Sequence, residues 1–374
     1  MQVHVASSRL ATEVTVAPDS TGREHLIVIT KATWSIPGPG QRPRPLAPEP
    51  VVMTDQYFGA PGESPLRYGA DIARFKPRCD VLFDASAHAP RGVAVPELVA
   101  GFALGPLVKH IRVTGPRRWQ GGGQSPNDFA LSEPESFLSV PLHAGLAFGG
   151  ARWFERDGQR LCDALQANPV GVGYAGPETL QQLAGQPAPQ LSYADEPLAH
   201  PDSSLRPAAL SGVGRHWMPR RSFAGTFDEA WQRDVFPLLP RDHDEQFNQC
   251  APQDQQMPHP RGGEPVRLYH LMPDRADVQF KLPRLDMQVR VLRTDYSQAA
   301  PQALVDTLFF DLPQQRFTAV WRASVPLRRR IQEISQVAIG PIDPVWWERQ
   351  RLGGGCAGCA DPAPESADAG LQEA

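Results

Sequence analysis

Proline is unusually frequent in this chain: 40 of its 374 residues are proline, and a further 32 are glycine. Proline lacks a backbone N–H and has a fixed φ, so it is excluded from helix interiors and from central strands. Together with glycine it favours turns. The pattern therefore predicts a mainly β protein, in which short strands are joined by turns and helices are few and short.

Several segments have the alternation and the β-branched content that are typical of strands. Residues 24–36 read EHLIVITKATWSI, and a turn rich in proline and glycine separates them from a second candidate strand, PVVMTDQYF. Residues 306–311 and 316–324 flank a turn and predict a hairpin. These patterns favour antiparallel pairing, so we expect two halves of antiparallel sheets in a sandwich-like arrangement.

Shifts in composition predict the domain organisation. Residues 1–167 are expected to form an N-terminal β half, and residues 168–214, rich in Gly and Pro, a linker or an arm wrapped over the fold. A C-terminal β half with short helices is expected over 215–350. The two halves either share sheets or fold separately. The tail, residues 351–374, is small, polar and acidic, and we expect it to be disordered.

The stretch 217–256 combines many aromatic residues with charged residues and prolines. So much aromatic area must be buried against something, either over one end of the β core or in a partner. Trp, Tyr and Arg carry most of the binding energy at protein interfaces, which makes Trp217, Arg220, Arg221 and Trp231 candidate partner-binding residues. The alternative is that both tryptophans belong to the core. Adjacent residues of an extended chain point opposite ways, and we expect Arg221 to be the outward one.

Three charged residues lie close together in the stretch SPLRYGADIARFKPRCD. Asp71, Lys76 and Asp80 predict a partly buried ion network. Such a network is stable only when its charges are paired and hydrogen-bonded. Because the sequence offers no nucleophile beside them, we expect these residues to stabilise the fold rather than to catalyse a reaction.

Several classes of function have no sequence signal. The formal net charge is −4 and no basic block accompanies an aromatic stripe, so nucleic acid is not an expected partner. No secretory signal and no apolar run of about 18 residues is present, which argues against membrane insertion. The five scattered cysteines suit a reducing cytoplasm rather than a disulfide framework.

Motifs for catalysis are also missing. The sequence has no G-x-S-x-G, P-loop or H-E-x-x-H motif and no G-x-G-x-x-G motif that opens a helix, so we expect a protein without enzymatic activity and without a cofactor. Cys356 and Cys359 form a C-x-x-C pair that suits half a zinc site or a redox pair. Two further ligands are missing nearby, so these cysteines are weak metal candidates and no metal is expected.

An ordered set of short motifs resembles the bacterial domain-of-unknown-function family 2169. The central motif is ADIARFKPRCDVLFDASAHAP, in which Asp71, Lys76, Pro77 and Asp80 match the family pattern. Smaller matches precede and follow it in the family's order: ATWSI, KHIRVTGPRRW, AFGG, NPVGVGY, the Trp217-x-Pro219-Arg220 motif, AGT, GGE, DTL and WRA. The pattern departs from the family at Pro116, where Asp is usual. The resemblance covers roughly residues 10–340.

The resemblance implies a function. Members of this family are associated with type VI secretion gene clusters, which implies a cytoplasmic adaptor or chaperone that loads a toxic effector protein onto the VgrG/PAAR spike. The family supplies no catalytic residues. Two other classes remain open, namely an enzyme that modifies or processes the effector and a structural component associated with the spike.

Overall fold

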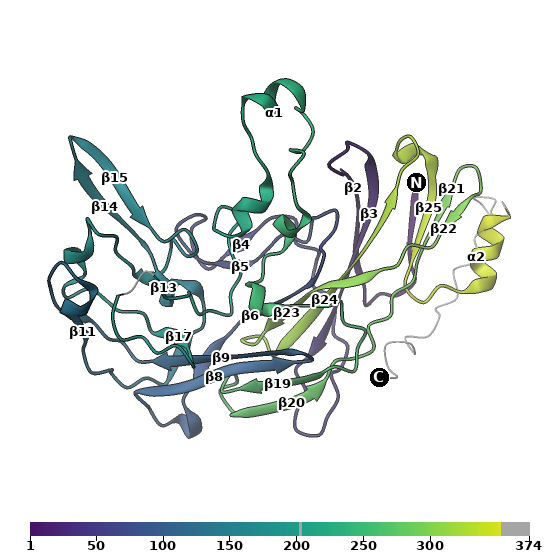
Figure 1. Ribbon diagram of the computed structural model, residues 1–374. Helices are drawn as coiled ribbons and strands as arrows, with labels where there is room; N and C mark the ends of the chain where they lie inside the picture. Colours follow the sequence, from purple (N-terminus) through teal and green to yellow (C-terminus); the bar gives the residue numbers. More distant parts are fainter. Residues whose placement is uncertain (202–203, 353–374) are drawn as a thin grey trace.

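The computed structural model describes residues 1–201 and 204–352, and it confirms the mainly β architecture. Three larger sheets form most of the body (Figure 1). The described part of the chain has two α-helices, both short, which are α1 (Glu229–Asp234) and α2 (Pro344–Arg351). The scarcity of helices follows from the frequency of proline.

The largest sheet has six strands. Their order is β18 (Gln256–Met257), β6 (Cys79–Asp84), β23 (Leu304–Asp311), β24 (Arg316–Pro326), β3 (Glu24–Ser35) and β2 (Ala11–Pro18). Successive residues of β3 face opposite sides of the sheet. Val28 packs in the main core, whereas Ile27 and Ile29 pack with Val320 in a separate cluster. Because both faces are covered, β3 is buried over residues 26–34, including the polar side chains among them.

Two further sheets flank the first. The five-stranded sheet has the order β17 (Leu191–Tyr193), β9 (Leu107–Thr114), β8 (Glu97–Leu104), β19 (Pro265–Tyr269) and β20 (Asp277–Lys281). The four-stranded sheet has the order β1 (Gln2–Val5), β25 (Ile334–Ile339), β21 (Val289–Arg293) and β22 (Gln298–Ala299).

Short elements complete the fold. The two-stranded pairs are β4 (Gln56–Tyr57) with β5 (Leu66–Tyr68), β7 (Ser86–His88) with β12 (Ser139–Pro141), β10 (Trp119–Gly121) with β11 (Phe129–Leu131), β13 (Phe148–Gly149) with β16 (Val172–Gly173), and β14 (Ala151–Arg156) with β15 (Gln159–Ala164). Single 3-10 turns are η1 (Pro90–Gly92), η2 (Pro126–Asp128), η3 (Ala144–Leu146), η4 (Leu180–Leu183), η5 (Arg220–Ala224), η6 (Glu245–Asn248), η7 (Gln253–Gln255) and η8 (Ile331–Glu333).

One hydrophobic core joins the three larger sheets. Its centre is a run of aromatic contacts in which the ring of Phe310 lies 4.8 Å from Phe83 and 5.5 Å from Phe317. Phe83 continues the run to Phe102 of the five-stranded sheet at 4.6 Å. Val291 of the four-stranded sheet belongs to the same cluster. Burial of this apolar area is the main free energy that holds the sheets together.

Strands from the beginning of the chain pair with strands from its end within the sheets. β3 pairs antiparallel with β24, and β6 pairs parallel with β23. β8 pairs with β19, and β1 runs parallel to β25. Residues 1–167 and 215–350 thus contribute to the same sheets and to one core.

The range 168–214 contributes ordered elements. It supplies η4 and the edge strand β17 of the five-stranded sheet, and it buries Leu183, Leu191 and Leu210. The expected disordered tail lies outside the described residues from 353 onward. No helix in the described ranges is long and apolar enough to span a bilayer.

Candidate functional site

An arm projects from the sheets, and it lies in the stretch with the most aromatic residues (Figure 1). We define the arm as residues 219–248, which contain η5, α1 and η6. η5 and η6 lie side by side where the arm leaves the body, and α1 forms the tip (Figure 1). The arm is therefore a loop that leaves the body and returns to the same place.

Short-range hydrogen bonds explain the shape of the arm. The Asp228 carboxylate accepts the Trp231 N–H at 2.7 Å and caps α1. Asp244 caps η6 in the same way by accepting the Gln246 N–H at 2.8 Å. Asp is favoured at helix N-termini because its carboxylate accepts a free backbone N–H of the first turn. Between the two stems, Thr226 Oγ1 donates to Asp242 at 2.7 Å.

The tip of the arm exposes apolar side chains. Phe227 and Phe236 are 56% and 65% exposed, and α1 contains no buried residue. Both rings lie edge-on to Trp231, at centroid distances of 4.8 and 5.6 Å. Leu238 is also exposed. An exposed apolar cluster on a projecting element is typical of a protein interaction site.

The arm also touches the body beyond its stems. A Cβ placed on Gly22, in the turn between β2 and β3, would lie 2.9 Å from a methyl carbon of Leu238. Gly22 has a φ of +83°, which side chains rarely adopt. Glycine at this turn therefore permits the arm to rest against the β2–β3 hairpin.

The four predicted partner-binding residues occupy different environments. Arg221 is exposed, and its side chain makes no hydrogen bond or ion pair with any described residue; Trp231 is half-buried in the tip cluster. Trp217 and Arg220 are only 2% and 4% exposed. For these two residues the prediction of a partner-facing role is corrected, because neither side chain reaches the surface.

Arg220 instead holds the base of the arm, whereas Trp217 is a buried core residue just before it. The Arg220 guanidinium donates to the carbonyl oxygens of Val213 and Phe247, each at 2.8 Å. Val213 lies in the segment that precedes the arm, and Phe247 lies in η6 at the end of the arm. Arg220 thereby ties the entry of the arm to its exit, and the sequence spacing gave no signal for this bond.

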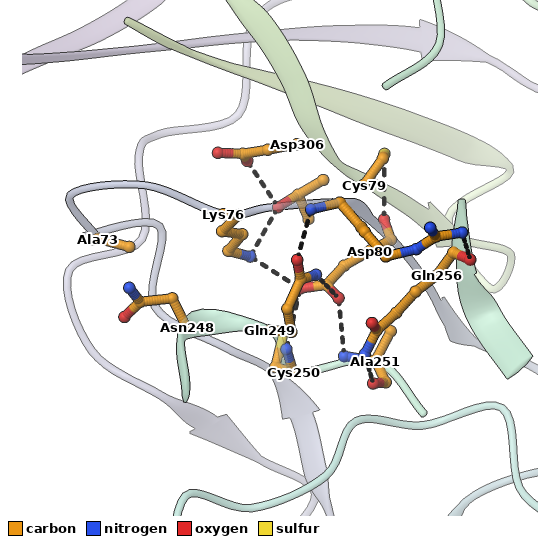
Figure 2. Close-up of polar contacts among 12 residues, drawn as sticks. Ala73, Lys76, Cys79, Asp80, Asn248, Gln249, Cys250, Ala251, Gln256 and Asp306 are labelled. Carbon is orange, nitrogen blue, oxygen red and sulfur yellow. Dashed lines mark hydrogen bonds and ion pairs between the residues drawn. The ribbon is translucent and has the colours of Figure 1, made fainter. Parts of the chain in front are cut away.

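A buried carboxylate accepts hydrogen bonds from the segment that follows the arm. Asp80, in β6, accepts the side-chain amide of Gln249 at 2.6 Å and the backbone N–H groups of Cys250 and Ala251 at 2.9 and 3.1 Å. Figure 2 shows Asp80 between this segment and Lys76. Hydrogen bonds to a charged acceptor are stronger than neutral ones. Asp80 therefore fixes the exit of the arm to the six-stranded sheet.

Lys76 supplies the positive charge that Asp80 requires. Its Nζ lies 2.9 Å from Asp80 and 2.9 Å from Thr307 Oγ1, and both charged side chains are buried. Burial opposes the charged form of Asp80, but the charge of Lys76 and the hydrogen bonds from Cys250 and Gln249 prevail and lower its pKa. Burial likewise opposes the Lys76 charge, and Asp80 outweighs it, so the Lys76 pKa is raised.

Asp71 is not part of the Lys76–Asp80 pair. It lies 3.2 Å from Lys31 Nζ and accepts the Tyr68 hydroxyl at 2.5 Å. Arg322 and Asp306 form a third buried ion pair at 2.5 Å. Arg322 also donates to the Asp71 carbonyl at 2.7 Å, which connects this pair to the pair of Asp71 with Lys31.

Three lysine or arginine side chains and three aspartates thus balance one another in the interior. Lys31, Asp306 and Arg322 were not predicted to belong to this network. The sequence did carry a signal for them, because each is a charged residue within a largely apolar strand. A charged side chain is buried in such a strand only when it is paired with an opposite charge.

The buried site does not favour covalent chemistry. Burial, followed by the nearby Asp80 charge, raises the pKa of the Cys250 thiol to about 12. A thiol reacts as its thiolate, and at neutral pH this group is protonated. Residues 1–201 and 204–352 contain no cluster of three or more His, Cys, Asp or Glu side chains arranged to hold a metal. Cys356 and Cys359 lie outside the described residues.

One protein family matches this chain. The family model DUF2169, described as an uncharacterized protein conserved in bacteria, matches residues 21–322. The chain belongs to this family. The DUF2169 match includes Asp80, the whole arm and the strands of the buried ion pairs. No curated protein and no solved structure matches the chain.

Proposed function

We propose that this protein is a non-enzymatic cytoplasmic adaptor that binds a toxic effector protein and loads it onto the VgrG/PAAR spike of a type VI secretion system. The observation that carries the proposal is the exposed aromatic cluster of Phe227, Trp231 and Phe236 on a projecting arm. The family resemblance supplies the identity of the partners.

The construction of the arm suits a protein that must bind and then release. Its base is held by Arg220 and by the Asp80 hydrogen bonds, so little conformational entropy is lost there on binding. Its tip contains a small apolar cluster. Arg221 is exposed at the other end of the arm, near the base. Such a site concentrates binding energy in a few aromatic and arginine side chains.

The partners are identified by affinity purification of the tagged protein from the native cytosol, followed by mass spectrometry. We expect enrichment of a toxin-domain protein or a VgrG or PAAR protein. Binding is then measured by titration with the purified partner, using the Phe227→Ser/Phe236→Ser variant. The matched control is Tyr296→Ser, which removes an aromatic ring that is 60% exposed on the body.

We expect the arm variant to lose at least about tenfold in affinity, or roughly 1.4 kcal/mol, while the control binds as the wild type does. Equal affinity of both variants contradicts a role for the arm. Three further observations separate an adaptor from a spike component and from an enzyme. If the protein is an adaptor, deletion of its gene abolishes delivery of one toxin, and the protein itself stays in the cytosol. A spike component is itself secreted, and an enzyme leaves the purified effector chemically altered.

A further inference from the structure

A cavity of about 520 Å³ lies away from the arm, among three segments that are distant in the sequence. Arg42 comes from the connection after β3, Arg261 from the loop before β19, and Lys281 and Arg284 from the end of β20 and the residues that follow. The volume is in the range of small-molecule sites, roughly 300–1,000 Å³. No acidic residue lines the cavity.

The positive charges of this cavity are largely uncompensated. The side chains of Arg42, Arg261 and Lys281 form no hydrogen bond or ion pair within the described part of the chain. Two carboxylates lie beside the cavity: Asp286 pairs with Arg284 at 2.6 Å, and Glu264 accepts two backbone N–H groups of the loop. The three arginines and one lysine of the cavity outnumber these two carboxylates, so the electrostatic potential in the cavity is positive. A concave surface strengthens such a potential.

The loop that carries Arg261 is held in place before any ligand arrives. Gly262 has a φ of +100°, and a Cβ there would lie 2.2 Å from the Pro283 carbonyl oxygen. The Gly263 N–H donates to the Leu282 carbonyl at 2.9 Å, and the Leu285 N–H donates to the Arg261 carbonyl at 3.0 Å. These contacts hold the backbone of the loop in place, so the Arg261 side chain starts from a fixed point at the edge of the cavity.

The same hydrogen bonds decide how an anion is recognised here. The N–H groups of Arg261 and Gly262 already donate to Glu264, each at 2.9 Å, and that of Gly263 donates to a carbonyl. The glycines therefore do not form a phosphate-binding loop of free N–H groups. Recognition falls to the arginine side chains, whose planar donors pair with phosphate in a bidentate manner.

We propose that this cavity binds a small organic phosphate that carries at least two negative charges. Several cations from separate segments require more than one negative charge on the ligand. The volume has room for an organic part beside the phosphates, against Pro43 and Leu282. The proposal is independent of the effector-loading function, because none of these residues belongs to the arm.

Inorganic pyrophosphate is the first probe, titrated calorimetrically into the full-length protein at low salt. We expect a Kd below about 1 mM. Arg42→Ala/Arg261→Ala should weaken binding at least about tenfold, and Lys281→Glu provides a second, independent variant. Because these side chains make no bonds to described residues, folding should be unchanged, which the thermal midpoint checks. The control is Arg349→Ala, an exposed arginine of α2.

Adenosine diphosphate is the second probe, and it tests the organic part. We expect it to bind more tightly than pyrophosphate and to lose affinity in the same two variants. No binding of pyrophosphate, or binding that the variants leave unchanged, overturns the site. Weaker binding of the nucleotide than of pyrophosphate overturns the assignment to an organic phosphate.

Discussion

The carboxylate of Asp80 accepts the backbone N–H of Cys250 at 2.9 Å, across 170 residues of sequence. This bond joins a central strand of the largest sheet to the end of the arm. Lys76 completes the arrangement by neutralising Asp80. The stability of the fold and the position of the candidate binding site therefore depend on the same buried ion pair.

Replacement of Lys76 by alanine should destabilise the protein. The change leaves the Asp80 charge buried without its partner, and we expect the free energy of unfolding to fall by about 1–4 kcal/mol. Urea denaturation followed by tryptophan fluorescence measures this. Arg233→Ala removes one side of an exposed ion pair and should leave the midpoint unchanged. A variant with full stability that nevertheless fails to deliver the effector would contradict the structural role.

Acid should weaken the fold through Asp80. The pKa of Asp80 lies below its ordinary value of 3.8 in the folded protein. Its contribution to stability is therefore present above that value and is lost as the pH falls through the lowered pKa. We expect the urea midpoint of the wild type to drop below about pH 4. Asp80→Asn should begin less stable and lose less on acidification; an identical slope in both proteins would refute this assignment.

The cysteines should differ sharply in reactivity. Cys162 is exposed, whereas Cys79 and Cys250 are buried, and burial raises the pKa of both buried thiols. In a Cys356→Ser/Cys359→Ser background, iodoacetamide at about pH 8 should label Cys162 alone in the native protein. All three cysteines should react in denaturant. Rapid labelling of Cys250 without denaturant would show that the end of the arm opens readily.

Charge reversal at Arg221 tests the partner-binding role of the arm. Its side chain is exposed and makes no hydrogen bond or ion pair with described residues, so Arg221→Glu should fold normally. We expect capture of the purified effector or spike protein to weaken by at least about tenfold, roughly 1.4 kcal/mol. Arg349→Glu, on α2, is the matched control. Equal capture by the two variants would place the docking surface elsewhere, and unfolding of Arg221→Glu would assign that residue to the core.

Local features of the fold were predictable from the sequence. The strand over residues 24–36 is β3, and the hairpin at 306–324 is β23 with β24; Asp228, a residue type favoured at helix N-termini, caps α1. These features depend on neighbouring residues, where alternation, turn residues and capping side chains act directly. The last helix, α2, begins at an Asp–Pro pair, which is a common helix start.

The long-range features were not predictable in the same way. The parallel pairing of β6 with β23 and the link from Asp80 to Cys250 join segments that no local pattern relates. Lys76 and Asp80 were grouped correctly because they lie four residues apart, whereas Asp71 turned out to pair with Lys31, 40 residues earlier. Partner choice among buried charges depends on the final packing of the sheets.

The pairing of early with late strands bears on how the protein is made. On the ribosome, β3 and β6 emerge long before β23 and β24, the two strands that finally lie between them in the sheet. Until then, both expose unpaired edges and apolar faces, and such surfaces favour aggregation. Folding of the nascent chain must therefore wait until synthesis is nearly complete, and a premature stop anywhere before residue 304 yields a product that lacks the middle of its largest sheet.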